Sequence, residues 1–462
     1  MAKSLLYSVI DNNEQALNEM SDAIWEYAEI AMEEEKSSKL QREFLAARGF
    51  TIKAVPNMPT AFVAETGSGK PIIGILGEYD ALGGLSQKVS SVREPLKDLS
   101  DAGHGCGHNL LGVGGVGAAI ALKEVMEQDG ISGTVRYYGC PAEETLSGKV
   151  MMAKEKVFDD LDAAISWHPA QMNTVWGCSF LAMNSIKFRF KGIPAHAAAA
   201  PHTGRSALDA VELMNVGANY LREHVIEKAR IHYVITNGGS APNTVPADAE
   251  VWYFVRAPKR KFVKEITDRL IKIAKGAELM SEAAMSYELL SGCYDVIPND
   301  VLREVLYANM DEVGPPKFEE EDFAFAREFT AQIPREDRAK VMEVYFAPEY
   351  ILDMDLCNEI TRVDDQGKVM AGSVDAGDVS YLAPFAQITA ATWPVGSAAH
   401  TWTSCACSGH SMGRRAMIFA AKSMAGTIYD LLKDPAKVKA AREEFEKSLN
   451  GFKYISPYDE TE

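Results

Sequence analysis

Positive charge is scarce in this sequence. Lys and Arg together number 47 against 65 for Asp and Glu, which gives the 462-residue chain a formal net charge of -18 at pH 7. Such a balance repels phosphate backbones and anionic lipid surfaces, so it argues against a protein that binds nucleic acid or a membrane. An anionic substrate would have to be met by a few placed cations or by metal ions.

Cysteine and long apolar runs are also largely missing. The seven cysteines are an odd number at irregular spacings, and nothing like a signal peptide precedes them, so a reducing cytoplasm is the expected compartment. The N-terminal stretch is acidic and amphipathic, and no run approaches the roughly 18 apolar residues that a membrane span needs. The sequence therefore predicts a soluble protein.

Apolar residues as such are plentiful. They make up 47% of the chain and charged residues 24%, which is ordinary for a globular protein with a sizeable core. The length is roughly three times that of a typical domain. We therefore expect two domains, or one large domain with an insertion.

The first 184 residues have the pattern of a layered α/β domain. The predicted helices cover residues 4–31, 38–48, 114–128 and 146–156, and the predicted strands cover residues 61–64, 72–76, 133–139 and 163–167. We expect the first two strands to form a hairpin, whose Gly-Ser-Gly-Lys turn lacks the spacing of a phosphate-binding loop. The alternation of strands and helices predicts a mixed, mostly parallel sheet flanked by helices.

An inserted domain is predicted at residues 185–298. Its expected strands cover residues 186–191, 232–236, 249–256 and 285–290, and its expected helices cover residues 206–224 and 261–277. The order βαββαβ is typical of a small α+β domain of ferredoxin-like type. The first domain, residues 1–184, then resumes over 299–462 and closes with an amphipathic helix at 414–432 and a charged tail.

Candidate metal ligands follow the predicted strands and lie in loops. Cys106 and His108 stand two apart among glycines, which let the backbone wrap closely around an ion. One such pair cannot complete a metal shell, but Glu144 and His168 lie at the ends of predicted strands and His400 lies late in the chain. In α/β metalloenzymes such scattered ligands meet at the carboxyl edge of the sheet, so we expect a single site.

The adjacent carboxylates Glu143 and Glu144 directly follow an apolar strand. Two adjacent carboxylates on a loop can have different roles, because one can bind a metal while the other accepts the proton of a water molecule. A lone pair of glutamates is solvated surface in most proteins, but a position directly after an apolar strand favours a functional role.

Several motifs occur in a fixed order along nearly the whole chain. They are Gly77-Glu-Tyr-Asp80-Ala-Leu, Gly103-His-Gly-Cys106-Gly-His108, Pro141-Ala-Glu143-Glu144, Trp167-His168-Pro169, Gly192-Ile-Pro-Ala-His196-Ala, Ala241-Pro-Asn243-Thr-Val-Pro246 and the late His400. Together they resemble the aminoacylase/carboxypeptidase family of metallopeptidases. Within its amidohydrolase branch the common pattern has Asp at the position of Asn109 and His-Pro at His400-Thr401, and these departures agree with the members that act on p-aminobenzoyl-glutamate.

The resemblance implies a catalytic domain of the zinc-peptidase type with two divalent metal ions, zinc or manganese. Cys106 would bridge the ions, His108 and His168 would complete one of them, and Glu144 and His400 would complete the other. Thiolate and imidazole suit zinc, but ligand softness alone does not settle which ion is bound.

The resemblance also assigns roles around the metals. Glu143 would be the general base, and Asp80 would be a carboxylate that orients a ligand. Glu78 stands where relatives outside this branch have a metal-binding histidine. A metal-loaded partner chain without turnover is an alternative, and the presence of Glu143 argues against it.

The inserted domain is implied to be a lid that makes a homodimer, with a related second subunit as another arrangement. His196 would reach across the dimer to stabilise the oxyanion, and Asn243 and Arg256 would hold the carboxylate of the substrate. Trp393 and Trp402, which flank His400, are candidates for an aromatic wall, although ordinary core tryptophans are at least as common at such positions.

The predicted activity is hydrolysis of the amide bond of an N-acyl amino acid, with p-aminobenzoyl-glutamate giving p-aminobenzoate and glutamate. A dipeptidase or a general N-acyl-amino-acid amidohydrolase keeps the same fold and metals and is the alternative. The roles of His104, His410, Asp375 and Asp378 stay open at this stage.

Overall fold

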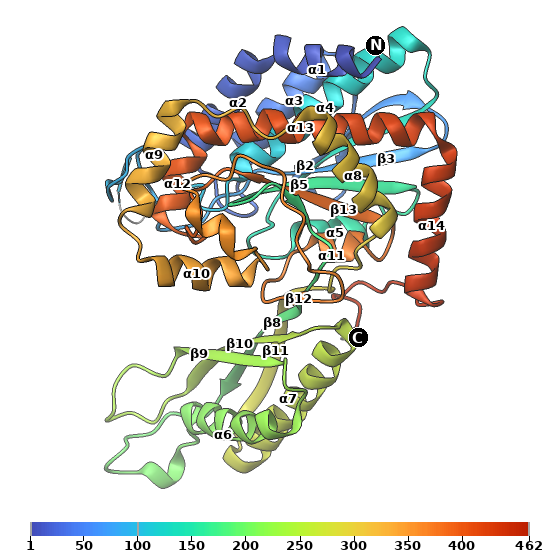
Figure 1. Cartoon of the computed structure of the whole chain (residues 1–462). Helices are drawn as coiled ribbons and strands as arrows, with labels where there is room; N and C mark the ends of the chain where they lie inside the picture. Colours follow the sequence, from blue (N-terminus) through green and yellow to red (C-terminus); the bar gives the residue numbers. More distant parts are fainter. Residues whose placement is uncertain (1, 99–100, 461–462) are drawn as a thin grey trace. The chain divides into compact units, whose positions relative to one another are not determined.

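The computed structural model describes residues 2–98 and 101–460, which separate into two compact units (Figure 1). The first unit comprises Met1–Cys178, Ile297–Met370 and Asp378–Tyr454, and the second comprises Ser179–Val296, Ala371–Gly377 and Ile455–Glu462. The second unit thus includes two short later segments that lie outside the domain predicted at 185–298. The outer limits predicted at residues 1 and 462 lie outside the described residues.

A seven-stranded mixed sheet with flanking helices forms the first unit, as predicted. Its order is β1-β2-β4-β3-β5-β13-β6, and Figure 1 shows α1, α2 and α13 above the sheet and α5 below it. The strands are β1 (Thr51–Val55), β2 (Met58–Ser68), β3 (Ile72–Glu78), β4 (Gly133–Cys140), β5 (Ala163–Ala170), β6 (Thr174–Val175) and β13 (Phe385–Ala391). The helices are α1 (Ala2–Asn12), α2 (Glu14–Tyr27), α3 (Glu35–Ala47), α4 (His108–Asp129), α5 (Gly148–Lys154), α8 (Asp300–Val313), α9 (Glu320–Thr330), α10 (Arg335–Val344), α12 (Trp402–Ser408), α13 (Ser411–Lys433) and α14 (Pro435–Leu449).

Shorter elements occur along the later part of the chain and in the second unit. They are η1 (Pro201–Thr203), η2 (Arg222–His224), η3 (Glu349–Asp353), β7 (Ser179–Phe180), β12 (Val369–Met370) and α11 (Ala376–Val379).

The predicted hairpin between the first two strands is wrong. Strand β4 lies between β2 and β3, antiparallel to β2 and parallel to β3. The parallel pairs β4·β3, β3·β5 and β5·β13 occupy the centre of the sheet, and antiparallel pairs lie toward both edges. The turn at Gly67–Pro71 therefore joins two strands that are neighbours in sequence but not in the sheet.

Helix α4 is a core helix of the first unit. It packs against α13 and against strands β3, β4 and β5. Contrary to the expectation from the sequence, this one helix among the described residues is long and apolar enough to cross a membrane, but 89% of the relevant window is buried inside the protein. Burial in the core accounts for its apolar composition.

The second unit has the predicted βαββαβ order. Strands β8 (Ala182–Lys191), β9 (Arg230–Asn237), β10 (Asp248–Ala257) and β11 (Ala284–Cys293) and helices α6 (Ala207–Leu221) and α7 (Arg260–Ser281) are its main elements. The sheet order is β11-β8-β10-β9. Side chains of β10 alternate between buried and half-buried, as expected for a strand with helices on one face.

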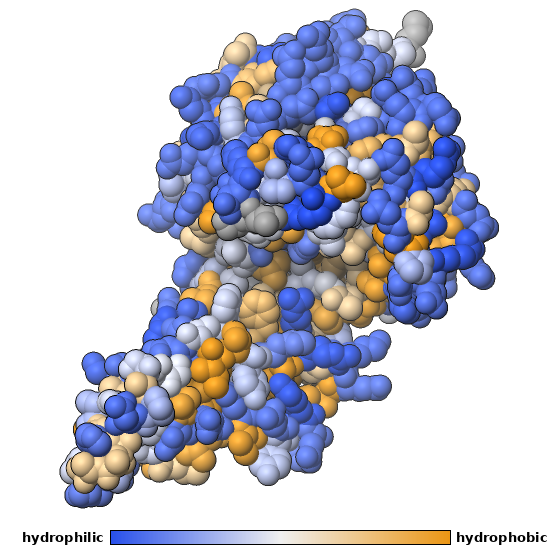
Figure 2. All heavy atoms as spheres, turned by 90° about the vertical axis from the view of Figure 1, so that its left-hand side faces the viewer, coloured by the Kyte–Doolittle hydropathy of each residue, from blue (hydrophilic) through white to orange (hydrophobic). Residues whose placement is uncertain are grey.

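Strand β9 forms an edge of this second sheet. Tyr233, Val234 and Ile235 on this strand are exposed by 36%, 54% and 39%. On the face drawn in Figure 2, apolar side chains lie exposed among hydrophilic ones on this unit. An exposed apolar edge strand is a surface on which another chain can pair.

Two other predicted boundaries differ from the structure. The long N-terminal helix is divided at Asn13 into α1 and α2, and the expected charged tail contains helix α14, which begins after Asp434 with Pro435 at its first turn. Asp before Pro at a helix start is a recognised capping signal, so α14 was detectable from the sequence.

Candidate metal centre

The five predicted metal ligands lie in the first unit and come from separate segments. Cys106 and His108 lie in the glycine-rich loop before α4 and in its first turn, and Glu144 follows β4. His168 lies near the end of β5, and His400 precedes α12. Because β3, β4 and β5 are parallel, their carboxyl ends reach one edge of the sheet, which places these residues together.

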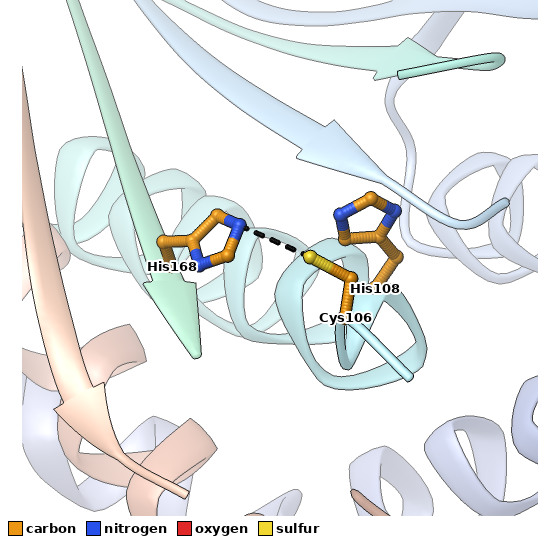
Figure 3. Close-up of side chains that lie close together, drawn as sticks. All are labelled: Cys106, His108 and His168. Carbon is orange, nitrogen blue, oxygen red and sulfur yellow. Dashed lines mark hydrogen bonds between the residues drawn. The ribbon is translucent and has the colours of Figure 1, made fainter. Parts of the chain in front are cut away.

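The ligand atoms of these residues form two groups that share Cys106. One group holds Cys106, His108 and His168, the other holds Cys106, Glu144 and His400, and within each group the atoms lie within 4.8 Å of one another. Figure 3 shows His168 directed at Cys106, with His168 Nε2 3.5 Å from Cys106 Sγ. His400 Nε2 lies 3.4 Å from Glu144 Oε2.

Hydrogen bonds fix which nitrogen of each histidine faces the site. His108 Nδ1 donates to Asp80 Oδ1 at 2.9 Å, and His168 Nδ1 donates to the backbone carbonyl of Pro169 at 2.7 Å. Both Nε2 atoms are thereby turned inward, which is how metal-binding histidines are usually oriented. Burial and the charge of His108 lower the pKa of His168 to about 4, so this imidazole is neutral at neutral pH.

Asp80 also positions the carboxylate pair. Its Oδ2 accepts a hydrogen bond from the backbone N–H of Glu144 at 2.8 Å. Burial raises the pKa of Glu144 to about 8, and the charges of Asp80 and Glu78 add to this effect while His108 opposes it. Glu143 is 7% exposed, and its Oε2 lies 3.9 Å from His108 Nε2.

Two residues next to the site have a left-handed backbone. Ala142 has φ 55° and His400 has φ 58°, and such conformations in residues other than glycine cluster at functional sites. Ala142 N–H donates to the buried Glu34 Oε1 at 2.8 Å, and His400 N–H donates to the Gly105 carbonyl at 3.0 Å. These bonds hold the loops of Glu144 and His400 against the rest of the unit.

The donor set fits metal ions. Within the described part of the chain, Glu78 Oε2, His108 Nε2 and Glu144 Oε1 are buried without a hydrogen-bond partner, although buried polar atoms are normally paired. Burial alone would lower the pKa of His108, but Cys106 and Asp80 raise it well above its usual value. The site therefore favours additional positive charge, which divalent ions bound to thiolate, imidazole and carboxylate would provide.

Two residues near the site, Lys149 and Trp176, were not singled out from the sequence. The fully buried Lys149 forms an ion pair at 2.6 Å with Glu78, which ends β3 and belongs to the Gly77–Leu82 motif. The ring of Trp176 lies 5.4 Å from that of His168. The sequence offered no signal for either residue, because a lone lysine in a helix and a lone tryptophan resemble ordinary structural residues.

The tryptophans proposed as an aromatic wall lie in a hydrophobic core. Trp393 is 1% exposed and donates from Nε1 to Ser408 Oγ at 3.3 Å, and Trp402 packs against Phe329 with ring centroids 5.7 Å apart. Trp176, by contrast, lies beside a candidate ligand, His168.

The residues left open have structural contacts. His104 is buried and donates from Nε2 to the Ile24 carbonyl at 3.0 Å, and His410 caps α13 and stacks on Phe325 with ring centroids 4.1 Å apart. Asp378 is buried and accepts from the Tyr454 hydroxyl at 2.8 Å. Asp375 is fully buried in the second unit.

His196, Asn243 and Arg256 belong to the second unit. His196 is exposed, its Nδ1 accepts from Ala199 N–H at 3.0 Å, and the Ala197 N–H donates to the Asn243 carbonyl at 3.0 Å, so these two loops run side by side. Arg256 is half-buried on β10, and within residues 2–98 and 101–460 it has no carboxylate partner. Burial lowers its pKa from the ordinary value.

Comparisons with known proteins identify the family of the chain. Residues 182–279 match the family model of a peptidase dimerisation domain. One subunit of the p-aminobenzoyl-glutamate hydrolase of Escherichia coli (strain K12) is 41% identical over 460 residues, which cover 97% of this chain and 95% of that protein. The Xaa-Arg dipeptidase of Mus musculus is 31% identical over 319 residues, which cover 66% of this chain and 70% of that protein.

A solved structure has the same fold. It is a dinuclear metal binding peptidase of the M20 family from Bacillus subtilis, and it matches with a TM-score of 0.58 and 16% identity over 92% of this chain and 99% of that chain. The fold and the relatives define the protein as a hydrolase of the peptidase type. The chain belongs to the M20 peptidase family.

Proposed function

We propose that the protein is a metal-dependent amidohydrolase that cleaves N-acyl amino acids, with p-aminobenzoyl-glutamate as its substrate. The observation that carries this proposal is the meeting of Cys106, Glu144 and three histidines around one small volume, with Glu143 beside them. The similarity to a full-length chain of a p-aminobenzoyl-glutamate hydrolase supports the substrate.

The five ligands suit two divalent ions. Cys106, His108 and His168 would hold one, and Cys106, Glu144 and His400 the other. When bound, such ions supply Lewis acidity toward the scissile carbonyl and toward water. Thiolate and imidazole suit zinc and carboxylate also suits manganese, so ligand type alone does not decide between the two ions.

Glu143 is proposed as the proton carrier. Its carboxylate is next in sequence to the ligand Glu144 and lies 3.9 Å from His108 Nε2, so it borders the metal volume from the side of His108. It would accept the proton of the attacking water and deliver it to the nitrogen of the leaving amine. The products are then a free acid and a free amino acid.

The second unit would supply the remaining groups. His196 accepts backbone hydrogen bonds at Nδ1, so its Nε2 carries the proton and can donate to an oxyanion. Arg256 and Asn243 would bind the α-carboxylate, and a half-buried Arg that pairs with no carboxylate of the described residues suits that task. Trp176, beside His168, is a candidate surface for the aminobenzoyl ring.

The direct test is hydrolysis of p-aminobenzoyl-glutamate by the purified chain after loading with zinc or manganese. The panel should also contain simple N-acyl amino acids and Xaa-Arg dipeptides, because the 31% identity to an Xaa-Arg dipeptidase makes that activity the second candidate. Preference for a dipeptide would replace the proposed substrate. Absence of amide hydrolysis across the panel, with metal bound, would reject the function.

The proposed assembly is a dimer through the second unit. The match to a peptidase dimerisation domain and the exposed apolar edge strand β9 support it. The relative from Escherichia coli is named as one subunit of its hydrolase, so a related second chain is the alternative partner. Activity of the purified chain alone, with its mass in solution, separates the two arrangements.

A further inference from the structure

Glu78 and Lys149 form a buried ion pair that the proposed reaction does not use. Lys149 is 0% exposed, and its Nζ lies 2.6 Å from Glu78 Oε1. A buried lysine is strongly unfavourable unless it is paired. The chain therefore maintains a carboxylate at this position together with a dedicated counter-ion.

The second oxygen of Glu78 faces the metal volume. Glu78 Oε2 lies 3.2 Å from His108 Nε2, and neither atom has a hydrogen-bond partner among the described residues although both are buried. His108 Nδ1 donates to Asp80, so Nε2 is the ring atom that faces Glu78. A cation bound between Glu78 Oε2 and His108 Nε2 would give both buried atoms a partner.

The separation is the one expected for two ligands of one ion. Ligand atoms on a tetrahedral metal with bonds of about 2.1 Å lie about 3.4 Å apart. Glu78, His108 and Glu143 form a further group of ligand atoms within 4.8 Å of one another, and this group shares only His108 with the group of Cys106, His108 and His168. Cys106, His108 and His168 supply only three ligands, and a tetrahedral ion accepts a fourth.

We infer that Glu78 is a fourth protein ligand of the ion held by Cys106, His108 and His168, and that Lys149 fixes the Glu78 carboxylate with Oε2 toward that ion. This inference rests on the proposed metal centre. It makes this ion more enclosed by protein than the one held by Glu144 and the exposed His400, whose side chain is 54% exposed.

The test uses cobalt(II) as the probe metal, because its visible spectrum depends on the number and type of its ligands. The double variant Glu78→Gln/Lys149→Met removes the ligand charge without leaving Lys149 unpaired. Lys149→Met alone keeps Glu78. Asp365→Asn/Arg303→Met is the matched control, since this pair is also buried, at 3.0 Å, and lies outside the site.

The metal-free proteins are titrated with cobalt(II) while circular dichroism verifies folding. We expect the double variant to show an altered visible spectrum and at least about tenfold weaker binding, since even outer partners of metal ligands contribute about 10- to 100-fold. Lys149→Met should change the spectrum less than the double variant does, because Glu78 remains but loses the group that orients it, and the control should keep the spectrum of the unmodified chain. An unchanged spectrum in the double variant, or the same change in Lys149→Met, would overturn the inference.

A failure of the proposed function gives a different result. If the unmodified chain binds no cobalt(II) and no zinc, the metal centre itself is wrong. If the unmodified chain binds metal and hydrolyses substrate while the double variant keeps its spectrum, only the role of Glu78 is wrong.

Discussion

At the scale of single residues, Glu143 separates catalysis from metal binding. Glu143→Gln keeps the size and hydrogen-bonding shape of the side chain but cannot accept the proton of water. We expect metal content to be unchanged and kcat to fall by about 10²- to 10⁴-fold, the usual contribution of a general base. Metal analysis and steady-state kinetics on one preparation measure both quantities. Near-normal turnover would reject Glu143 as the base.

Arg256 tests recognition of the substrate carboxylate. Charged hydrogen bonds contribute about 1.5–3 kcal/mol, so Arg256→Ala should raise KM for p-aminobenzoyl-glutamate by about 10- to 100-fold. Arg189→Ala is the control, because Arg189 is an arginine of the same sheet that is already paired with Glu250 and Glu288.

The amidated substrate is the complementary probe for Arg256. An analogue whose α-carboxylate is an amide should be a poor substrate for the unmodified enzyme and should lose little further on Arg256→Ala. If the amidated analogue is cleaved as fast as p-aminobenzoyl-glutamate, Arg256 does not bind the α-carboxylate. A general acyl-amide hydrolase then becomes the better interpretation.

The site residues that could be predicted from the sequence are those whose chemistry can be recognised without knowing what surrounds them in the fold. A thiol and an imidazole two apart, or two adjacent carboxylates after a strand, have few structural uses, so Cys106 and Glu143 were candidates from the start. Lys149 and Trp176 were not, because their significance depends on what lies beside them in the fold. For Trp393 the sequence left both an aromatic wall and an ordinary core position open, and the structure places it in the core.

At the scale of elements, the loop that carries the carboxylates depends on the start of α5. A Cβ atom on Gly148 would lie 1.7 Å from the Pro141 carbonyl oxygen, which is backbone and cannot give way as a flexible side chain can. Gly148→Ala should therefore displace the segment that ends in Glu143 and Glu144. We expect loss of stability of at least about 1–3 kcal/mol, the usual range for overpacking, together with weaker metal binding.

Gly276→Ala is the matched control for Gly148→Ala. Gly276 lies inside helix α7, and a Cβ there would meet nothing within 4 Å. Alanine in a helix interior is favoured over glycine by about 0.8–1 kcal/mol, so this variant should be slightly more stable and should bind metal normally. Thermal unfolding with and without zinc measures both variants. Equal behaviour of the two would contradict the role given to the α5 start.

Periodicity predicted the existence of most elements but not the neighbours of the strands. The βαββαβ order of the second unit followed from alternating runs and helical spacing, and the structure confirms it. The hairpin failed because β4, which is more than 50 residues after β3 in sequence, lies between β2 and β3. Such pairing is decided by the crossover through α4, which local patterns do not contain.

At the scale of the whole molecule, the proposed assembly makes each active site depend on two chains. The five ligands and Glu143 lie in the first unit, whereas His196 and Arg256 lie in the second, which matches a dimerisation domain. Net charge and composition argue against nucleic acids and membranes as partners. They do not say whether His196 comes from the same chain or from the opposite chain, because a self-complementary surface leaves no compositional signal.

Complementation between two inactive chains tests this dependence. In a mixed dimer of Glu143→Gln with His196→Ala chains, supply of His196 by the opposite chain leaves one site with both groups intact. Random mixing makes about half of the dimers mixed, so activity should recover to about a quarter of the unmodified level. If each chain used its own His196, both sites of every mixed dimer would lack one group and no activity would return.

Glu143→Gln mixed with a Glu143→Gln/His196→Ala chain is the control and must stay inactive. Native mass spectrometry verifies that mixed dimers have formed, and inactivity of verified mixed dimers would show that His196 does not act across the interface.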